Sequence, residues 1–120
     1  MFSFEKLLVY QKARELVKEV YKLQKRFPTE ERFALGDQIR RSITSVTSNI
    51  AEGSGRDSQK EKIHFIEIAF GSLMEAFSQL QNAQDIEYLS ETEIEILRPK
   101  FEEISKMLSG LKSSLEKSLT

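Results

Sequence analysis

Apolar residues recur at alternating steps of three and four along the last third of the chain, and this spacing is the strongest constraint on the fold. Seven of them follow steps of three, four, three, four, three and four residues between Ile94 and Leu115. The pattern puts all seven on one face of an α-helix, and that face must pack against other helices. It predicts a helix over residues 91–117, although Pro99 should kink it between Glu95 and Pro99 or make it restart there.

Three earlier segments carry the same periodicity and predict helices over residues 4–26, 30–52 and 59–85. Phe27-Pro28 ends the first helix, because the residue before a proline is disfavoured in helical angles, and Thr29 is suited to cap the second. Gly53-Ser54-Gly55 should end the second helix. In the third, large and small residues alternate along a seam formed by Ile66, Ala69, Leu73, Ala76, Leu80 and Ala83.

Capping boxes mark the starts of the last two helices, one from Ser58 to Glu61 and one from Ser90 to Glu93. Four amphipathic helices of about 20 residues joined by short connections form an antiparallel up-down-up-down bundle. The sequence therefore predicts an all-α fold, with one four-helix-bundle domain over residues 1–120.

The residues that most enzymes and metal sites require are scarce in this chain. It has no cysteine, and His64 is its one histidine, so one subunit cannot build a cysteine–histidine nucleophile pair or a site with several histidines. A di-iron bundle needs Glu-x-x-His on two helices, whereas Glu61 to His64 is the single candidate here. The sequence predicts a protein that is not an enzyme and has no metal or cofactor.

Membrane and export signals are also missing from the sequence. No apolar run approaches the roughly 20 residues that a membrane-spanning helix needs, and the first six residues lack the pattern of a signal peptide. These features predict a cytoplasmic protein with no membrane partner, and the lack of cysteine agrees with that location.

Charge is unevenly distributed, although the net charge is −1. Residues 1–62 hold 13 Lys/Arg and 9 Asp/Glu, a balance of +4, whereas residues 63–120 hold 5 and 10, a balance of −5. Such a division can orient a subunit against an oppositely charged neighbour or steer a nucleic acid to one face. Solvated helix faces that happen to differ in charge are an equally good interpretation.

Several basic residues are candidate contacts to the phosphates of RNA or DNA. Glutamates interleave with them, and the isoelectric point near 5.9 is unlike that of a dedicated nucleic-acid-binding protein. Any such binding is therefore expected to be weak. The candidates are Lys18, Lys22, Lys25 and Arg26 on the first helix, and Arg40 on the second.

A row of polar residues runs beside the apolar face of the second predicted helix. Steps of three, four, four and three place these side chains on one stripe, and Glu75 of the third helix is a candidate partner for Arg41. We interpret the row as a partly buried, hydrogen-bonding seam that fixes helix register or a subunit contact. The alternative is a nucleic-acid or ligand surface. The row consists of Gln38, Arg41, Ser45, Asn49 and Glu52.

The stretch over residues 38–53, and above all Ser48-Asn49-Ile50-Ala51-Glu52-Gly53, resembles the signature of a bacterial family of proteins encoded in intervening sequences of 23S ribosomal RNA genes. Tyr10-Gln11-Lys12-Ala13 and the stretch over residues 69–75 are similar to further motifs of that family. Tyr10 stands where the family often has tryptophan, and Val46-Thr47 stands where many members have Ile-Pro.

This resemblance implies a four-helix bundle that assembles into a homopentameric ring. The family is also similar to accessory proteins of diversity-generating retroelements, which bind a reverse transcriptase and nucleic acid through a strongly basic surface. The chain differs from those relatives in its net charge of −1. The favoured hypothesis is a non-catalytic, oligomeric adaptor associated with nucleic acid or ribonucleoprotein; the alternative is a protein-interaction scaffold with no nucleic-acid role.

Overall fold

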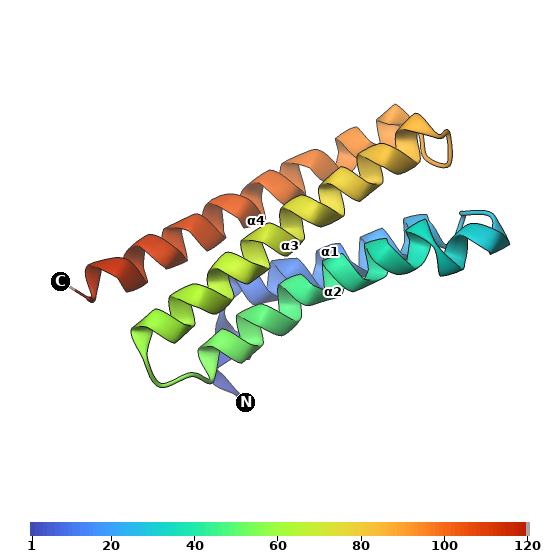
Figure 1. Ribbon diagram of the computed structural model, residues 1–120. Coiled ribbons are helices and arrows are strands. Elements are labelled where there is room, and N and C mark those ends of the chain that lie inside the picture. The colour runs from blue at the N-terminus through green and yellow to red at the C-terminus, as the bar shows by residue number, and fades with distance from the viewer. Residues whose placement is uncertain (120) are drawn as a thin grey trace.

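The structure, a computed structural model, describes residues 1–119 and confirms the all-α prediction. This part of the chain holds four α-helices and two short 3₁₀ helices and no strand (Figure 1). The helices are α1 Leu8–Gln24, α2 Leu35–Ser54, α3 Gln59–Asp85 and α4 Glu91–Lys117, and the 3₁₀ helices are η1 Ser3–Lys6 and η2 Thr29–Phe33.

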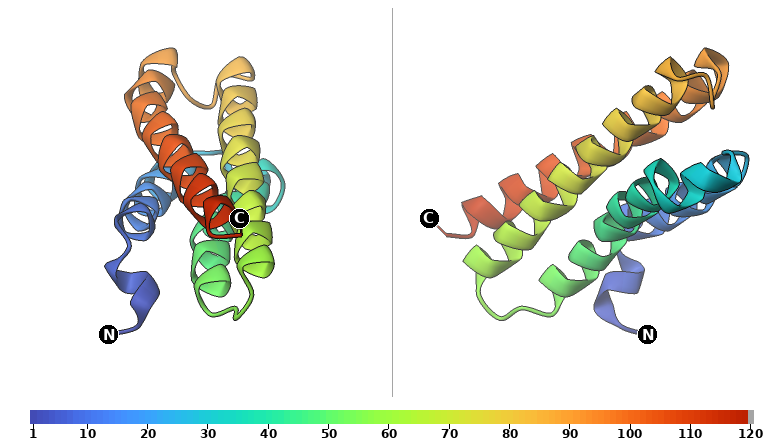
Figure 2. Two further views of the ribbon diagram at one scale, coloured as in Figure 1. Left: turned by 90° about the vertical axis from the view of Figure 1, so that its left-hand side faces the viewer. Right: turned by 45° about the vertical axis from the view of Figure 1, so that its right-hand side comes forward.

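Consecutive helices run in opposite directions, so the chain forms an elongated up-and-down bundle of 48 × 23 × 22 Å. The hairpin of α1 and α2 makes one layer and the hairpin of α3 and α4 makes the other (Figure 2). Both hairpin turns, η2 and the α3–α4 connection, lie at the same end of the molecule. None of the helices in residues 1–119 is long and apolar enough to cross a membrane.

The core contains most of the apolar residues that the helical periodicity predicts, while Leu111 and Leu115 of α4 are half-buried and pack against it. The α3 seam is fully packed, since its large and small members are at most 5% exposed, Ile66 being the most exposed. The alanines let α2 and α4 approach closely, while the leucines fill the space between them. Ile94, Leu97, Phe101, Ile104 and Leu108 form the buried face of α4.

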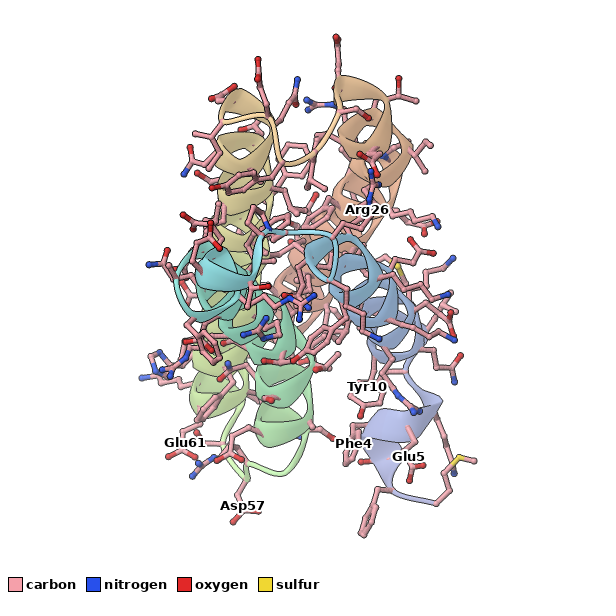
Figure 3. The ribbon with its side chains drawn as sticks, turned by 90° about the vertical axis from the view of Figure 1, so that its right-hand side faces the viewer. Phe4, Glu5, Tyr10, Arg26, Asp57 and Glu61 are labelled. Carbon is pink, nitrogen blue, oxygen red and sulfur yellow. The ribbon has the colours of Figure 1, made fainter. Side chains whose placement is uncertain are left out.

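The first helix begins later than residues 4–26 predict, because Leu7 is extended (φ −71°, ψ 125°) and separates η1 from α1. The Phe2 amide donates to Glu5 Oε1 at 2.8 Å, which closes η1. Phe4 then packs edge-on against Tyr10, with ring centres 4.9 Å apart (Figure 3). The hydrogen bond of Glu5 and the ring contact of Phe4 both stabilise η1 as a separate turn. The first residues therefore fold back and do not extend α1.

The second helix begins at Leu35 and not near residue 30, and Thr29 makes no side-chain cap. The backbone changes direction at Ala34 (φ −114°, ψ −100°), after η2. Gly36 follows in a narrow space, where a Cβ atom would lie 3.1 Å from the Glu31 carbonyl oxygen. Close packing of η2 over the start of α2 therefore overrides the local capping preference.

The Gly53-Ser54-Gly55 stretch ends the second helix as predicted, but Gly53 itself lies inside α2, which runs two residues beyond the predicted end at residue 52. Gly53 is buried, and a Cβ atom at this position would lie 2.9 Å from the Cβ of Phe65. The helix runs to Ser54 and is capped by Gly55. Gly53 is thus a packing glycine that lets α2 approach α3.

α4 is continuous from Glu91 to Lys117, so the predicted restart at Pro99 does not occur. Pro99 is exposed, while Leu97 and Phe101 on either side are buried. Burial of this face outweighs the roughly 3 kcal/mol that a proline costs inside a helix.

The seam between α1 and α4 is bridged by ion pairs. The Lys12 Nζ lies 3.0 Å from Glu103 Oε1, and Glu19 pairs with Lys100. These side chains are partly exposed, so each pair contributes about 0–1 kcal/mol. The α2–α3 seam on the other side is held by neutral hydrogen bonds, described below.

Candidate nucleic-acid interface

The centre of the predicted polar row is a hydrogen-bonded seam between α2 and α3. Ser45 Oγ and Ser72 Oγ lie 2.8 Å apart, and Asn49 Nδ2 donates to the Ser45 carbonyl oxygen at 2.8 Å. Buried Ser42 donates to Gln79 Oε1 at 2.7 Å. Because a buried hydroxyl left unpaired is costly, these contacts fix the register of the two helices.

Ser42, Ser72 and Gln79 were not among the residues that the sequence singled out for this seam. Ser42 lies one residue beyond Arg41 on a helix rich in serine and threonine, where spacing alone cannot choose which hydroxyl faces a partner. Its partner is 37 positions away, so the contact depends on tertiary packing.

The outer members of the row, Gln38, Arg41 and Glu52, are exposed and do not join the seam. Arg41 Nε pairs with Asp37 Oδ2 at 2.9 Å, whereas Glu75 Oε2 accepts from Nε2 of the seam residue Gln79 at 3.2 Å. The predicted pairing of Arg41 with Glu75 is therefore wrong, because Asp37 lies one turn away on the same helix. Glu52 pairs with Arg56, and Gln38 is exposed.

Three of the candidate phosphate contacts lie together in a groove of about 680 Å³ on the outer side of α1. We call it the α1 groove; it is lined by Gln11, Arg14, Glu15, Val17, Lys18, Tyr21 and Lys22 of α1, by Lys25 directly after α1, and by Thr44 of α2. Steps of four, four and three align the four basic side chains along the helix. Sequence reasoning missed Arg14, although its spacing from Lys18 is that of a neighbour on the same face.

Glu15 also lines the α1 groove and lies 3.6 Å from the Lys18 Nζ. The groove thus has four cationic side chains and one carboxylate. The Lys18–Glu15 pair is well exposed, so it restrains Lys18 only weakly. Lys18 can therefore leave Glu15 and turn toward an anionic ligand at little cost.

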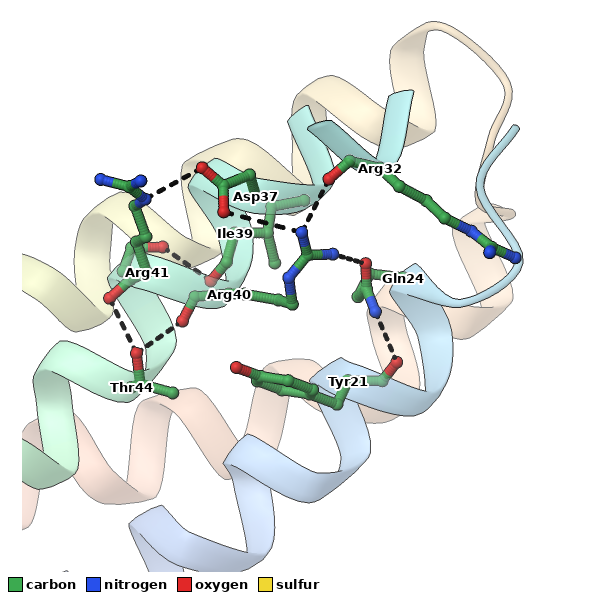
Figure 4. Close-up of polar contacts among 9 residues, drawn as sticks. Tyr21, Gln24, Arg32, Asp37, Ile39, Arg40, Arg41 and Thr44 are labelled. Carbon is green, nitrogen blue, oxygen red and sulfur yellow. Dashed lines mark hydrogen bonds and ion pairs between the residues drawn. The ribbon is translucent and has the colours of Figure 1, made fainter. Parts of the chain in front are cut away.

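The other two candidates, Arg26 and Arg40, bind within the protein. Arg26 pairs with Glu93 in the first turn of α4. Arg40 donates to Gln24 Oε1 and, at 2.7 Å, to the Arg32 carbonyl oxygen, and its guanidinium lies 3.6 Å from Asp37 (Figure 4). Arg40 therefore ties α1, η2 and α2 together, and both terminal nitrogens of its guanidinium are engaged within the protein.

A second groove, of about 390 Å³, lies between α3 and α4 and has a different character. We call it the α3–α4 groove; Met74, Phe77, Arg98, Phe101 and Glu102 are among its lining residues. The Arg98 guanidinium lies 4.9 Å from the centre of the Phe77 ring. Its hydrogen bond to Glu95 raises the pKa of Arg98, so it remains charged. One cation and one carboxylate line this groove, so it has no cationic row.

Within residues 1–119, no group of three or more His, Asp or Glu side chains is arranged to hold a metal ion. The prominent chemical features of the described chain are therefore the basic α1 groove, the apolar α3–α4 groove and the neutral seam between α2 and α3.

Comparison with known proteins identifies relatives of this architecture. A crystal structure of a protein of unknown function from the S23 ribosomal protein family of Bacteroides thetaiotaomicron VPI-5482 is similar, with a TM-score of 0.80 and 26% sequence identity. The match covers 88% of this chain and 98% of that chain. None of the curated proteins compared with the chain matches it.

The family model described as 23S rRNA-intervening sequence protein matches residues 5–110. The matched range includes the α1 groove, the α2–α3 seam and most of α4. It also includes the residues over 38–53 and 69–75 on which the resemblance rests. The chain therefore belongs to the 23S rRNA-intervening sequence protein family.

Proposed function

We propose that this protein is a non-catalytic, oligomeric adaptor that binds nucleic acid weakly through the α1 groove, in the cytoplasm. The observation that carries the proposal is the row of Arg14, Lys18, Lys22 and Lys25 along one groove. Arg14 and Lys25 are eleven positions apart, so at a rise of 1.5 Å per residue the row spans about 16 Å, the length of roughly five phosphates along one strand. The row therefore matches a phosphate backbone in charge and in length.

Salt dependence of binding tests this proposal. Four phosphate contacts in each subunit should make the logarithm of the association constant fall with the logarithm of salt concentration, at a slope of about −3 per groove. Fluorescence anisotropy with labelled RNA and DNA between about 20 and 200 mM salt measures this slope. Absence of binding to both at the lowest salt concentration would overturn the proposal.

The proposed assembly is the homopentameric ring that the resemblance implies. The opposite charge balances of residues 1–62 and 63–120, which fall largely in different layers, support association of one face with a different face. Such heterologous contacts close into rings. The ring would place several α1 grooves on one particle, so weak sites would act together on one nucleic acid.

Molar mass from light scattering coupled to size exclusion is expected to be about five times the 13.9 kDa of one chain. The mass should remain near that value at micromolar concentrations, and moderate salt should lower it if charge complementarity contributes. A monomer mass across the micromolar range would contradict the ring while leaving nucleic-acid binding to be judged by its own test.

The alternative is a scaffold that binds another protein and no nucleic acid. Exposed apolar side chains on α3 favour it, since Ile68 is 36% and Met74 is 41% exposed. They lie within residues 63–120, which have a charge balance of −5. An intact oligomer that binds neither RNA nor DNA at low salt would favour this second function over the first.

A further inference from the structure

Tyr21 is the aromatic residue that lines the α1 groove. Tyr21 and Val17 lie among the four basic side chains that line it. A duplex presents phosphates and sugars on its outside and keeps its bases stacked, so an aromatic floor adds nothing to its binding. An unpaired base exposes a flat face that can stack on a tyrosine.

We propose that the α1 groove binds single-stranded nucleic acid, with one base stacked on Tyr21 and the adjacent phosphates held by the basic row. This inference rests on the proposed function, because it specifies the ligand of the same groove. The groove volume of about 680 Å³ lies within the range of small-ligand sites. It therefore has room for a nucleotide unit beside the ring.

The Tyr21 side chain is half-buried and packs against the core. Its backbone carbonyl oxygen accepts from Gln24 Nε2 at 3.3 Å, so the hydrogen bonds drawn around it hold the α1–α2 turn and leave the ring without a polar partner among the residues drawn (Figure 4). A ring restrained by packing on one side loses little conformational freedom on binding, which favours its use as a stacking surface.

The α3–α4 groove lacks this combination, which makes it a suitable internal control. Its Phe77 ring is covered by Arg98, and one cation faces one carboxylate there. An aromatic ring without a row of cations offers no path for a phosphate backbone. Charge complementarity thus selects the α1 groove for a polyanionic strand.

Three variants test the proposal by anisotropy on a labelled single strand of about 12 nucleotides and on the corresponding duplex. Tyr21→Leu removes the aromatic face and should weaken single-strand binding roughly tenfold, because stacking of one base is worth about that much. It should leave duplex affinity unchanged. Tyr21→Phe should retain wild-type affinity for both ligands, and Met74→Ala in the α3–α4 groove should also do so.

Direct evidence of stacking is available from a fluorescent variant. The chain contains no tryptophan, so Tyr21→Trp introduces a single indole at the site. Its emission should be quenched on addition of the single strand and should change little on addition of the duplex. Circular dichroism and the thermal midpoint of each variant establish that it is folded.

The results separate this inference from the proposed function. If Tyr21→Leu and wild type bind the single strand equally while replacement of Lys18 and Lys22 by glutamate removes binding, the groove contacts phosphates alone and the stacking proposal is overturned. Polyglutamate is a polyanion without bases, so it should displace the labelled single strand less well than the unlabelled strand does. If the two competitors displace it equally, the stacking proposal is overturned as well. If neither nucleic acid binds wild type at low salt, the proposed function fails too.

Discussion

Replacing Lys18 and Lys22 together with glutamate is expected to weaken nucleic-acid binding by about a hundredfold. Each reversal removes one phosphate contact and adds a repulsion, and 1.4 kcal/mol corresponds to a factor of ten in affinity. The slope of affinity against salt concentration should also become shallower by about two, one for each lysine. Anisotropy titrations of the folded variant at several salt concentrations measure both effects.

A matched control has the same change in charge at sites outside the groove. Lys60 and Lys106 are exposed and neither lines the α1 groove, so Lys60→Glu with Lys106→Glu should retain most of the affinity. Equal losses in the two double variants would mean that binding follows net charge and not the α1 groove. The molar mass of Lys18→Glu with Lys22→Glu must match wild type, since a smaller mass would make the groove a contact between copies.

Replacing Gly53 with alanine is expected to destabilise the fold by about 2 kcal/mol and to lower the thermal midpoint by roughly 8 °C. The new Cβ would meet the Cβ of Phe65 at 2.9 Å, an atom next to the backbone that cannot move unless α2 and α3 separate. This cost exceeds the gain of about 1 kcal/mol that alanine brings over glycine in a helix. Thermal and urea unfolding followed by circular dichroism measure the change.

Two other helical glycines serve as controls, because replacing them with alanine should raise the stability and not lower it. Gly71 and Gly110 lie within α3 and α4, and an added Cβ at either meets nothing within 4 Å. Gly71→Ala and Gly110→Ala should each stabilise the protein by up to about 1 kcal/mol. A Gly53→Ala variant as stable as these two would contradict the close approach of α2 and α3.

The sequence predicts the last two helices well because their signals are local. The serine N-caps at Ser58 and Ser90 both form, since each hydroxyl accepts from a backbone amide, 3.0 Å from Glu61 and 3.1 Å from Glu93. The capping box at Ser90 is complete, because the Ser90 amide also donates to Glu93 Oε1 at 2.9 Å, whereas at Ser58 the structure shows the serine cap alone. The heptad spacing of α4 persists through Pro99, since burial of that face decides the conformation. Short-range chemistry and periodicity together determine these helices.

Features that depend on tertiary contacts were less predictable. Gly53 has the appearance of a helix breaker in the sequence, and only the approach of Phe65 from α3 explains why a glycine stands there. Arg40 has the appearance of an exposed phosphate contact until Gln24 and the Arg32 carbonyl oxygen are brought to it by the α1–α2 turn. Within the candidate site, sequence spacing predicted the row of Lys18, Lys22 and Lys25, but it did not predict that Tyr21 lines the same groove.

Contact between the α1 groove and phosphates is tested most directly by lysine acetylation of the full chain, measured by mass spectrometry with and without a saturating single-stranded oligonucleotide at low salt. We predict that Lys18, Lys22 and Lys25 lose most of their reactivity in the complex, while Lys60 and Lys106 keep theirs. Equal reactivity of all five lysines with and without bound oligonucleotide would contradict nucleic-acid binding through the α1 groove.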